Sequence, residues 1–100
     1  MEVIVKTENK QIKAIQLLGH ACNYSSGITS KICMCISILT QVVEELDPNG
    51  VTRCESGEFE YSPTNIVNFS YLEVLIYVLA VLKERYPLSF TIKEKEYKNG

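Results

Sequence analysis

Residues 30–50, SKICMCISILTQVVEELDPNG, decide the order of elements around them, because they join a helical repeat to a sharp turn. Apolar side chains recur here at helical spacing and form one stripe, made by Ile32, Ile36, Leu39, Val43 and Leu46. Ser30 is a typical N-cap residue, so the pattern predicts a helix over residues 30–46. Asp47-Pro48-Asn49-Gly50 is a strong turn signal that ends the helix.

The segments on either side of this helix alternate as strands do. Before it, two runs form a hairpin around Glu8-Asn9-Lys10: Glu2–Thr7 and Gln11–Leu18. After it, we expect two short strands, a second helix and a last strand, over Val51–Cys54, Glu58–Tyr61, Ser62 to about Tyr86, and Leu88–Lys93. The order β-β-α-β-β-α-β predicts a single α/β (α+β) domain over residues 1–100, with mainly antiparallel strands packed on two helices.

The second predicted helix is apolar nearly all round between Val74 and Leu82. A helix of that kind must be covered on more than one side. The cover is either a second layer of the domain or the partner in a dimer.

Composition narrows the classes of function. The chain has 100 residues and a formal net charge of -2 at pH 7, with no basic stripe, so we expect no direct nucleic-acid binding. No apolar run approaches the roughly 20 residues that span a bilayer, and the N-terminus lacks a signal-peptide pattern. We therefore expect a cytoplasmic protein without membrane contacts, whose four cysteines are reduced.

Two of these cysteines, Cys33 and Cys35, lie on the first predicted helix and differ in environment. On a helical wheel Cys35 falls inside the apolar stripe, where a thiol is buried and inert. Cys33 falls at the border of the polar face, beside Ser37. With Ser30 as N-cap, Cys33 lies in the first turn, where free N–H groups and the helix dipole favour a thiolate and could hold an oxyanion. Cys33 is therefore the candidate nucleophile, against the alternative of a small residue at a helix start.

His20 is the only histidine in the chain and the candidate general base. It begins a polar loop, residues 19–29, that can return it to the start of the helix. The only aspartate, Asp47, lies roughly 20 Å further along the helix, which argues against a catalytic triad. A Cys33–His20 dyad is favoured. Ser37, one turn after Cys33, hydrogen-bonds either the site or its own helix carbonyl.

A metal site is the weaker alternative. His20-Ala21-Cys22 and Cys33-Met34-Cys35 supply enough ligand atoms for zinc. Their spacing departs from the paired C-x-x-C motifs, and Cys33 and Cys35 point in nearly opposite directions on a helix. We expect no metal and no cofactor.

The pattern Gly19-His20-Ala21, a polar loop, Cys33 and Ser37 resembles the ribosomal-processing cysteine protease family Prp. Family members carry an Asp three residues before the cysteine, where this chain has Ser30, and a loop about one residue shorter. The resemblance implies His20 and Cys33 as catalytic residues, supported by Gly19, Ser30 and Ser37.

The resemblance also implies a function and a partner. The family has an α/β fold, forms homodimers, and removes a short N-terminal extension from the twenty-seventh protein of the large ribosomal subunit, cleaving after an aromatic residue. Two alternatives stay open: a phage-encoded homologue that processes capsid or scaffold proteins, and a non-enzymatic interaction module of the same fold.

Overall fold

The structure is a computed structural model that describes residues 1–20, 27–55 and 57–96, of which residues 27–30 by their backbone alone. It contains five strands and two helices in the predicted order. Their bounds are β1 Glu2–Glu8, β2 Gln11–Leu18, α1 Gly27–Leu46, β3 Val51–Glu55, β4 Glu58–Tyr61, α2 Phe69–Arg85 and β5 Thr91–Glu96. The predicted fold class, a single α+β domain, is confirmed.

The strands form one mixed sheet in the order β3-β4-β2-β1-β5. All neighbouring strands are antiparallel except β1 and β5, which are parallel. Asn9 and Lys10 join β1 to β2 with positive φ angles of 52° and 64°, as expected for the tight turn of a hairpin whose twist matches its strands.

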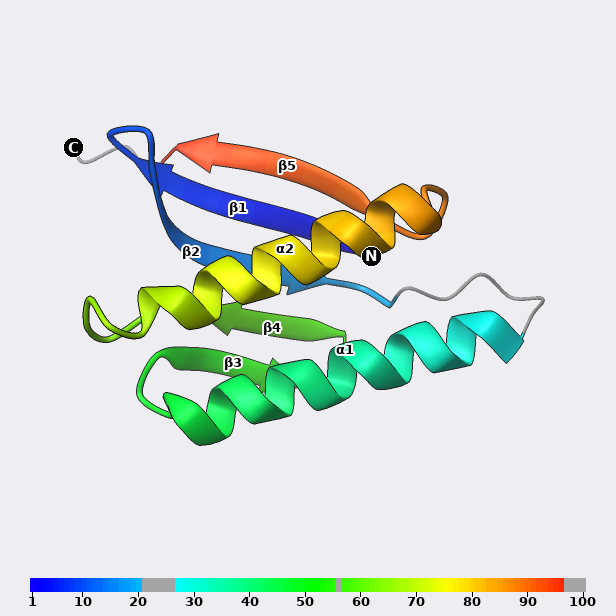
Figure 1. Cartoon of the computed structure of the whole chain (residues 1–100), viewed down its shortest axis with the longest axis horizontal. Helices are drawn as coiled ribbons and strands as arrows, with labels where there is room; N and C mark the ends of the chain where they lie inside the picture. The colour runs from blue at the N-terminus through cyan, green and yellow to red at the C-terminus, as the bar shows by residue number, and fades with distance from the viewer. Residues whose placement is uncertain (21–26, 56, 97–100) are drawn as a thin grey trace.

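Both helices run along the strands on one side of the sheet, with α2 over β1 and β2 and α1 beside β3 and β4 (Figure 1). Alternate residues of three strands face them and are buried: Val3, Val5, Ile15, Leu17, Phe59 and Tyr61. The helices contribute Ile32, Ile36, Val43, Leu72, Leu75 and Leu79. Ion pairs cross the opposite face of the sheet, among them Lys6–Glu60 at 3.1 Å and Glu2–Lys93 at 3.3 Å, so this face suits water.

Asp47 joins the end of α1 to β4 and to the segment before α2. Its Oδ2 accepts hydrogen bonds from the Tyr61 hydroxyl at 2.9 Å and from the Thr64 backbone N–H at 3.1 Å. Its Oδ1 accepts one from Thr64 Oγ1 at 2.7 Å. Burial favours the neutral acid, but the bonds from Thr64, Tyr61 and Asn68 outweigh it and hold the pKa of Asp47 below its ordinary value of 3.8.

Gly50 allows this crowded corner to form. A Cβ at Gly50 would lie 2.6 Å from the Ser62 carbonyl oxygen and 2.9 Å from Asp47 Oδ2. The Gly50 N–H donates to the Asp47 carbonyl at 3.0 Å, and its carbonyl accepts from Ser62 at 2.9 Å. Only a residue without a side chain fits between these groups.

Three elements have a boundary at least three residues from the one expected. The first helix begins at Gly27, so Ser30 lies inside it and is not its N-cap. The second helix begins at Phe69 rather than near Ser62, because the preceding segment is held in turns by Asp47. The last strand is displaced to Thr91–Glu96.

The second helix is buried on one face only. Leu72, Leu75 and Leu79 pack on the sheet, whereas Val74 and Tyr77 are 54% and 72% exposed. The expectation that this helix is covered on more than one side is therefore not met within the described parts of this chain.

We predict that Asp47→Asn lowers the free energy of unfolding by about 2 kcal/mol, because the amide cannot accept from the donors that face Oδ2. Chemical denaturation at pH 7 measures this loss, with Glu45→Gln, at an exposed neighbouring position, as the control.

The same carboxylate makes stability pH-dependent. Its folded pKa lies below the unfolded value, so its contribution is full above about pH 4 and is lost as the pH falls through the folded pKa. Between pH 6 and pH 3 the wild type should lose more stability than Asp47→Asn. Parallel losses in the two proteins would contradict the assignment.

Candidate active site

A cavity of about 430 Å³ lies between α1 and the β3–β4 hairpin, at the end of β2. Four of the five predicted site residues line it: Gly19, His20, Cys33 and Ser37. Its apolar wall includes Leu17, Ile36 and Phe59. The fold therefore brings these four residues to one cavity, two from the segment after β2 and two from α1.

His20 follows the last residue of β2 and a glycine with a φ of +80°, Gly19. The Gly19 N–H donates to the Gly57 carbonyl at 2.8 Å, which ties this end of β2 to the β3–β4 turn. The amino nitrogen of Met1 donates to the His20 carbonyl at 3.1 Å and to the Ser89 carbonyl at 2.8 Å. The backbone of His20 is thus held from two neighbouring segments.

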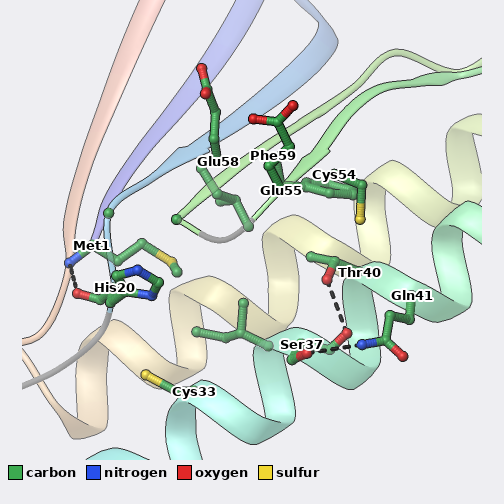
Figure 2. A pocket seen from close by; sticks show the side chains of 14 residues that line it. Met1, His20, Cys33, Ser37, Thr40, Gln41, Cys54, Glu55, Glu58 and Phe59 are labelled. Atoms are coloured by element: carbon green, nitrogen blue, oxygen red, sulfur yellow. Dashed lines mark hydrogen bonds between the residues drawn. The ribbon is translucent and has the colours of Figure 1, made fainter.

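Figure 2 shows His20 and Cys33 at one end of the cavity and Cys54 at the other. The imidazole comes from the β2 end and is solvent-exposed, whereas Cys33 projects from α1 and is half-buried against the core. An exposed base and a half-buried thiol that line one cavity are an arrangement that nucleophilic catalysis can use.

The start of α1 changes the expected electrostatics of Cys33. Since the helix begins at Gly27, Cys33 is its seventh residue rather than part of its first turn. Backbone N–H groups at that depth are engaged in helical hydrogen bonds, and the dipole effect falls off within the first turn. The expectation that the helix start stabilises a Cys33 thiolate and an oxyanion is therefore wrong.

Cys35 was expected to be buried and is exposed. The buried side of α1 is centred on Ile36 and Val43 and includes Thr40, which is 7% exposed. On the other side, Val42 and Leu46 are 47% and 52% exposed. The side of α1 that faces the core therefore includes Cys33 and excludes Cys35.

Cys54 also lines the cavity, although the sequence gave no reason to single it out. A hydrogen bond from its thiol to the Glu44 carboxylate, with burial and the Glu44 charge, raises the pKa of Cys54 to about 11. A thiol with that pKa is almost entirely protonated at neutral pH and is a poor nucleophile. Of the described cysteines, Cys33 is therefore the one suited to attack a substrate in this cavity.

Ser37 lies one turn after Cys33 and takes part in a short chain of hydrogen bonds. Its Oγ accepts from Gln41 Nε2 at 3.0 Å, and its carbonyl accepts from Thr40 Oγ1 at 3.0 Å (Figure 2). Thr40 and Gln41 both line the cavity and were not singled out from the sequence. The spacing of four residues between Ser37 and Gln41 was the signal that could have found the latter.

Three residues of the predicted motifs cannot be compared with the structure. Ala21 and Cys22 fall outside the described residues, as does the side chain of Ser30. Within the described ranges, no three metal-ligating side chains come together, and no helix is long and apolar enough to cross a membrane.

The architecture and the cavity define a class: a single α+β domain in which a histidine after β2 and a cysteine on α1 line one cavity. This is the fold of the ribosomal processing protease Prp. The S. aureus Prp structure, solved in complex with a covalently linked product peptide, aligns with a TM-score of 0.73 and 15% identity, over 94% of this chain and 98% of that one.

SMU.848 from Streptococcus mutans aligns with a TM-score of 0.65 and 18% identity, over 96% of this chain and 94% of its own. No family model matches the sequence, and no curated protein matches it. The resemblance to Prp noted in the sequence is therefore confirmed at the level of the fold.

We predict that Cys54 resists alkylation until Glu44 is changed. Glu44→Gln removes the carboxylate that raises the pKa, so the thiolate fraction of Cys54 at pH 8 should rise by at least about tenfold. Peptide mapping after brief iodoacetamide treatment measures the rate at each cysteine, and Cys35 serves as the internal reference. An unchanged ratio of Cys54 to Cys35 labelling would show that Glu44 does not control this thiol.

Proposed function

We propose that this chain is a cysteine endopeptidase in which Cys33 is the nucleophile and His20 the general base. The observation that carries the proposal is that both side chains line one cavity in a fold shared with a protease. Cys54 is a poorer nucleophile because its pKa is raised, and Asp47 is engaged by Thr64 away from the cavity. Among the described residues, Cys33 and His20 are therefore the best nucleophile–base pair.

The proposed reaction proceeds through a thioester. His20 takes the proton of Cys33, and the thiolate attacks the scissile carbonyl carbon. The imidazolium then protonates the leaving amine as the tetrahedral intermediate collapses. A water molecule, deprotonated by His20, hydrolyses the thioester and frees the thiol.

The donor for the oxyanion must come from elsewhere than the helix start. Ser37 is placed to serve, because its oxygen already accepts the Gln41 amide and its own proton remains to be donated. A hydroxyl on the same face as the nucleophile, one turn along, suits that role.

For the substrate, we propose a protein with a short N-terminal extension, and specifically the twenty-seventh protein of the large ribosomal subunit. The S. aureus protein with this fold was solved with a product peptide, which supports a peptide as the ligand of the cavity. A cytoplasmic location accords with this substrate. A capsid or scaffold protein of a phage is the alternative substrate.

We predict that Cys33→Ala abolishes cleavage of the ribosomal protein precursor, with a loss of at least about 10⁴-fold in kcat. Cys35→Ala is the matched control, because it makes the same change two residues along the same helix at an exposed position. Mass spectrometry of the precursor after incubation detects removal of the extension. Equal activity in the two variants, both folded, would exclude Cys33 as the nucleophile.

The interaction-module alternative has one observation in its favour, which is that Cys33 lies beyond the first turn of α1. The two functions differ in the coupling of the thiol to the imidazole. In a protease, His20→Ala should change the pH profile of Cys33 alkylation; in an interaction module, the profile should be that of an ordinary thiol with or without His20.

We also propose that the chain forms a homodimer through α1. Four apolar side chains lie four residues apart on the outer face of this helix and are about half or more exposed: Met34, Ile38, Val42 and Leu46. A continuous apolar stripe of this kind is typical of a surface that another chain covers.

We predict that wild type sediments as a dimer and that Ile38→Glu sediments as a monomer, because the charge would be desolvated within the stripe. Analytical ultracentrifugation at tens of micromolar measures the difference. Ile66→Glu, at an 89% exposed site before α2, is the matched control. A monomeric wild type would refute the proposed dimer.

A further inference from the structure

Gly57 lies in the turn between β3 and β4, directly beside the His20 imidazole. A Cβ on Gly57 would lie 3.0 Å from His20 Nε2, 3.5 Å from Cε1 and 3.6 Å from Cδ2. The edge of the ring that carries Nε2 therefore faces the bare Cα of this glycine. A separation of 3.0 Å is tighter than nearly all contacts of a real Cβ, so a side chain at this position would push the ring away by a few tenths of an ångström.

The same residue holds the backbone next to His20. The Gly57 carbonyl accepts the Gly19 N–H at 2.8 Å, which fixes the distance between the turn and the end of β2. Because separating the two segments would break this bond, an added side chain is expected to move the exposed ring rather than the backbone.

Gly19, at the other end of this hydrogen bond, shows by contrast that the contact is specific. Both glycines have a positive φ, +80° for Gly19 and +77° for Gly57. A Cβ on Gly19 would have no atom within 4 Å. The backbone conformation alone explains the glycine at 19, whereas at 57 the imidazole also lies closer than a side chain would normally allow.

We propose that Gly57 is a positioning residue for His20: its bare Cα leaves the space in which the imidazole rests, and its carbonyl holds the segment that carries the ring. The β3–β4 turn thereby sets where Nε2 lies relative to the cavity. The catalytic meaning of this placement rests on the proposed function; the placement itself does not.

The direct test is nuclear magnetic resonance of the wild-type chain. His20 is the only histidine, so its ring protons form a single set of resonances. We expect nuclear Overhauser effects between the Gly57 α-protons and the Hε1 and Hδ2 protons of the ring. Their absence from the well-folded protein would overturn the proposal, and this test needs no variant and no substrate.

Two variants separate the effect of the side chain from that of backbone strain. Gly57→Ala and Gly57→Asn both add a Cβ, but asparagine adopts positive φ more readily than alanine. If the contact with His20 matters, both should shift the imidazole resonances and lower kcat/KM roughly tenfold, mainly through kcat. Thermal melting of each variant records the strain separately.

The outcomes distinguish this proposal from the proposed function. Wild-type ring resonances in folded Gly57 variants, or an activity loss that follows melting temperature alone, would overturn the role of Gly57. If His20→Ala instead left the pH profile of Cys33 alkylation unchanged, the dyad would fail, while the Overhauser contacts would still decide whether Gly57 positions the ring.

Discussion

The hydrogen bonds that the Asp47 carboxylate accepts are the interactions on which the arrangement of this domain most depends. It accepts hydrogen bonds from Tyr61 on β4 and from Thr64 before α2, at the point where α1 ends. These bonds connect the end of α1 to β4 and to the segment that follows β4, across the intervening strand β3. The cavity has α1 as one wall and the β3–β4 hairpin as another, so the bonds of Asp47 to β4 also hold the two walls of the site together. A buried acceptor with several donors is stable only when all of them are in place, which makes this corner rigid.

The order of elements was predictable because it follows from local patterns. Alternation predicted the hairpin of β1 and β2, helical spacing predicted α1, and Asn49-Gly50 predicted the turn after it. The start of α2 was not predictable in the same way. Ser62-Pro63 is a typical helix opening, but the N–H and hydroxyl of Thr64 are taken by Asp47, a contact across 17 positions of sequence. Tertiary hydrogen bonds overrode a local signal there.

The site residues also divide into those that local sequence could predict and those that depend on tertiary contacts. Gly19, His20, Cys33 and Ser37 could be found from residue type and spacing, and they line one cavity. The exposure of Cys35 could not, because Val42 and Leu46 extend the apparent apolar stripe although both are exposed. A helix with apolar side chains on two faces does not reveal from sequence which face the sheet will cover. Gly57 was equally hidden, since its significance lies in a ring that is distant in sequence.

The displaced start of α1 has a consequence for how a thiolate could form. Cys33 is not in the first turn of α1, so free backbone N–H groups do not stabilise its thiolate. Within the proposed dyad, the His20 imidazolium is then the positive charge that can do so. The attraction between a thiolate and an imidazolium falls as the two groups separate. Each ångström of separation costs more free energy where water is partly excluded, because the dielectric constant is lower there. The proposed activity would then depend less on the helix than on where the ring of His20 rests. In the arrangement that we propose, the β3–β4 turn limits that position, because the absence of a side chain at Gly57 leaves room for the ring.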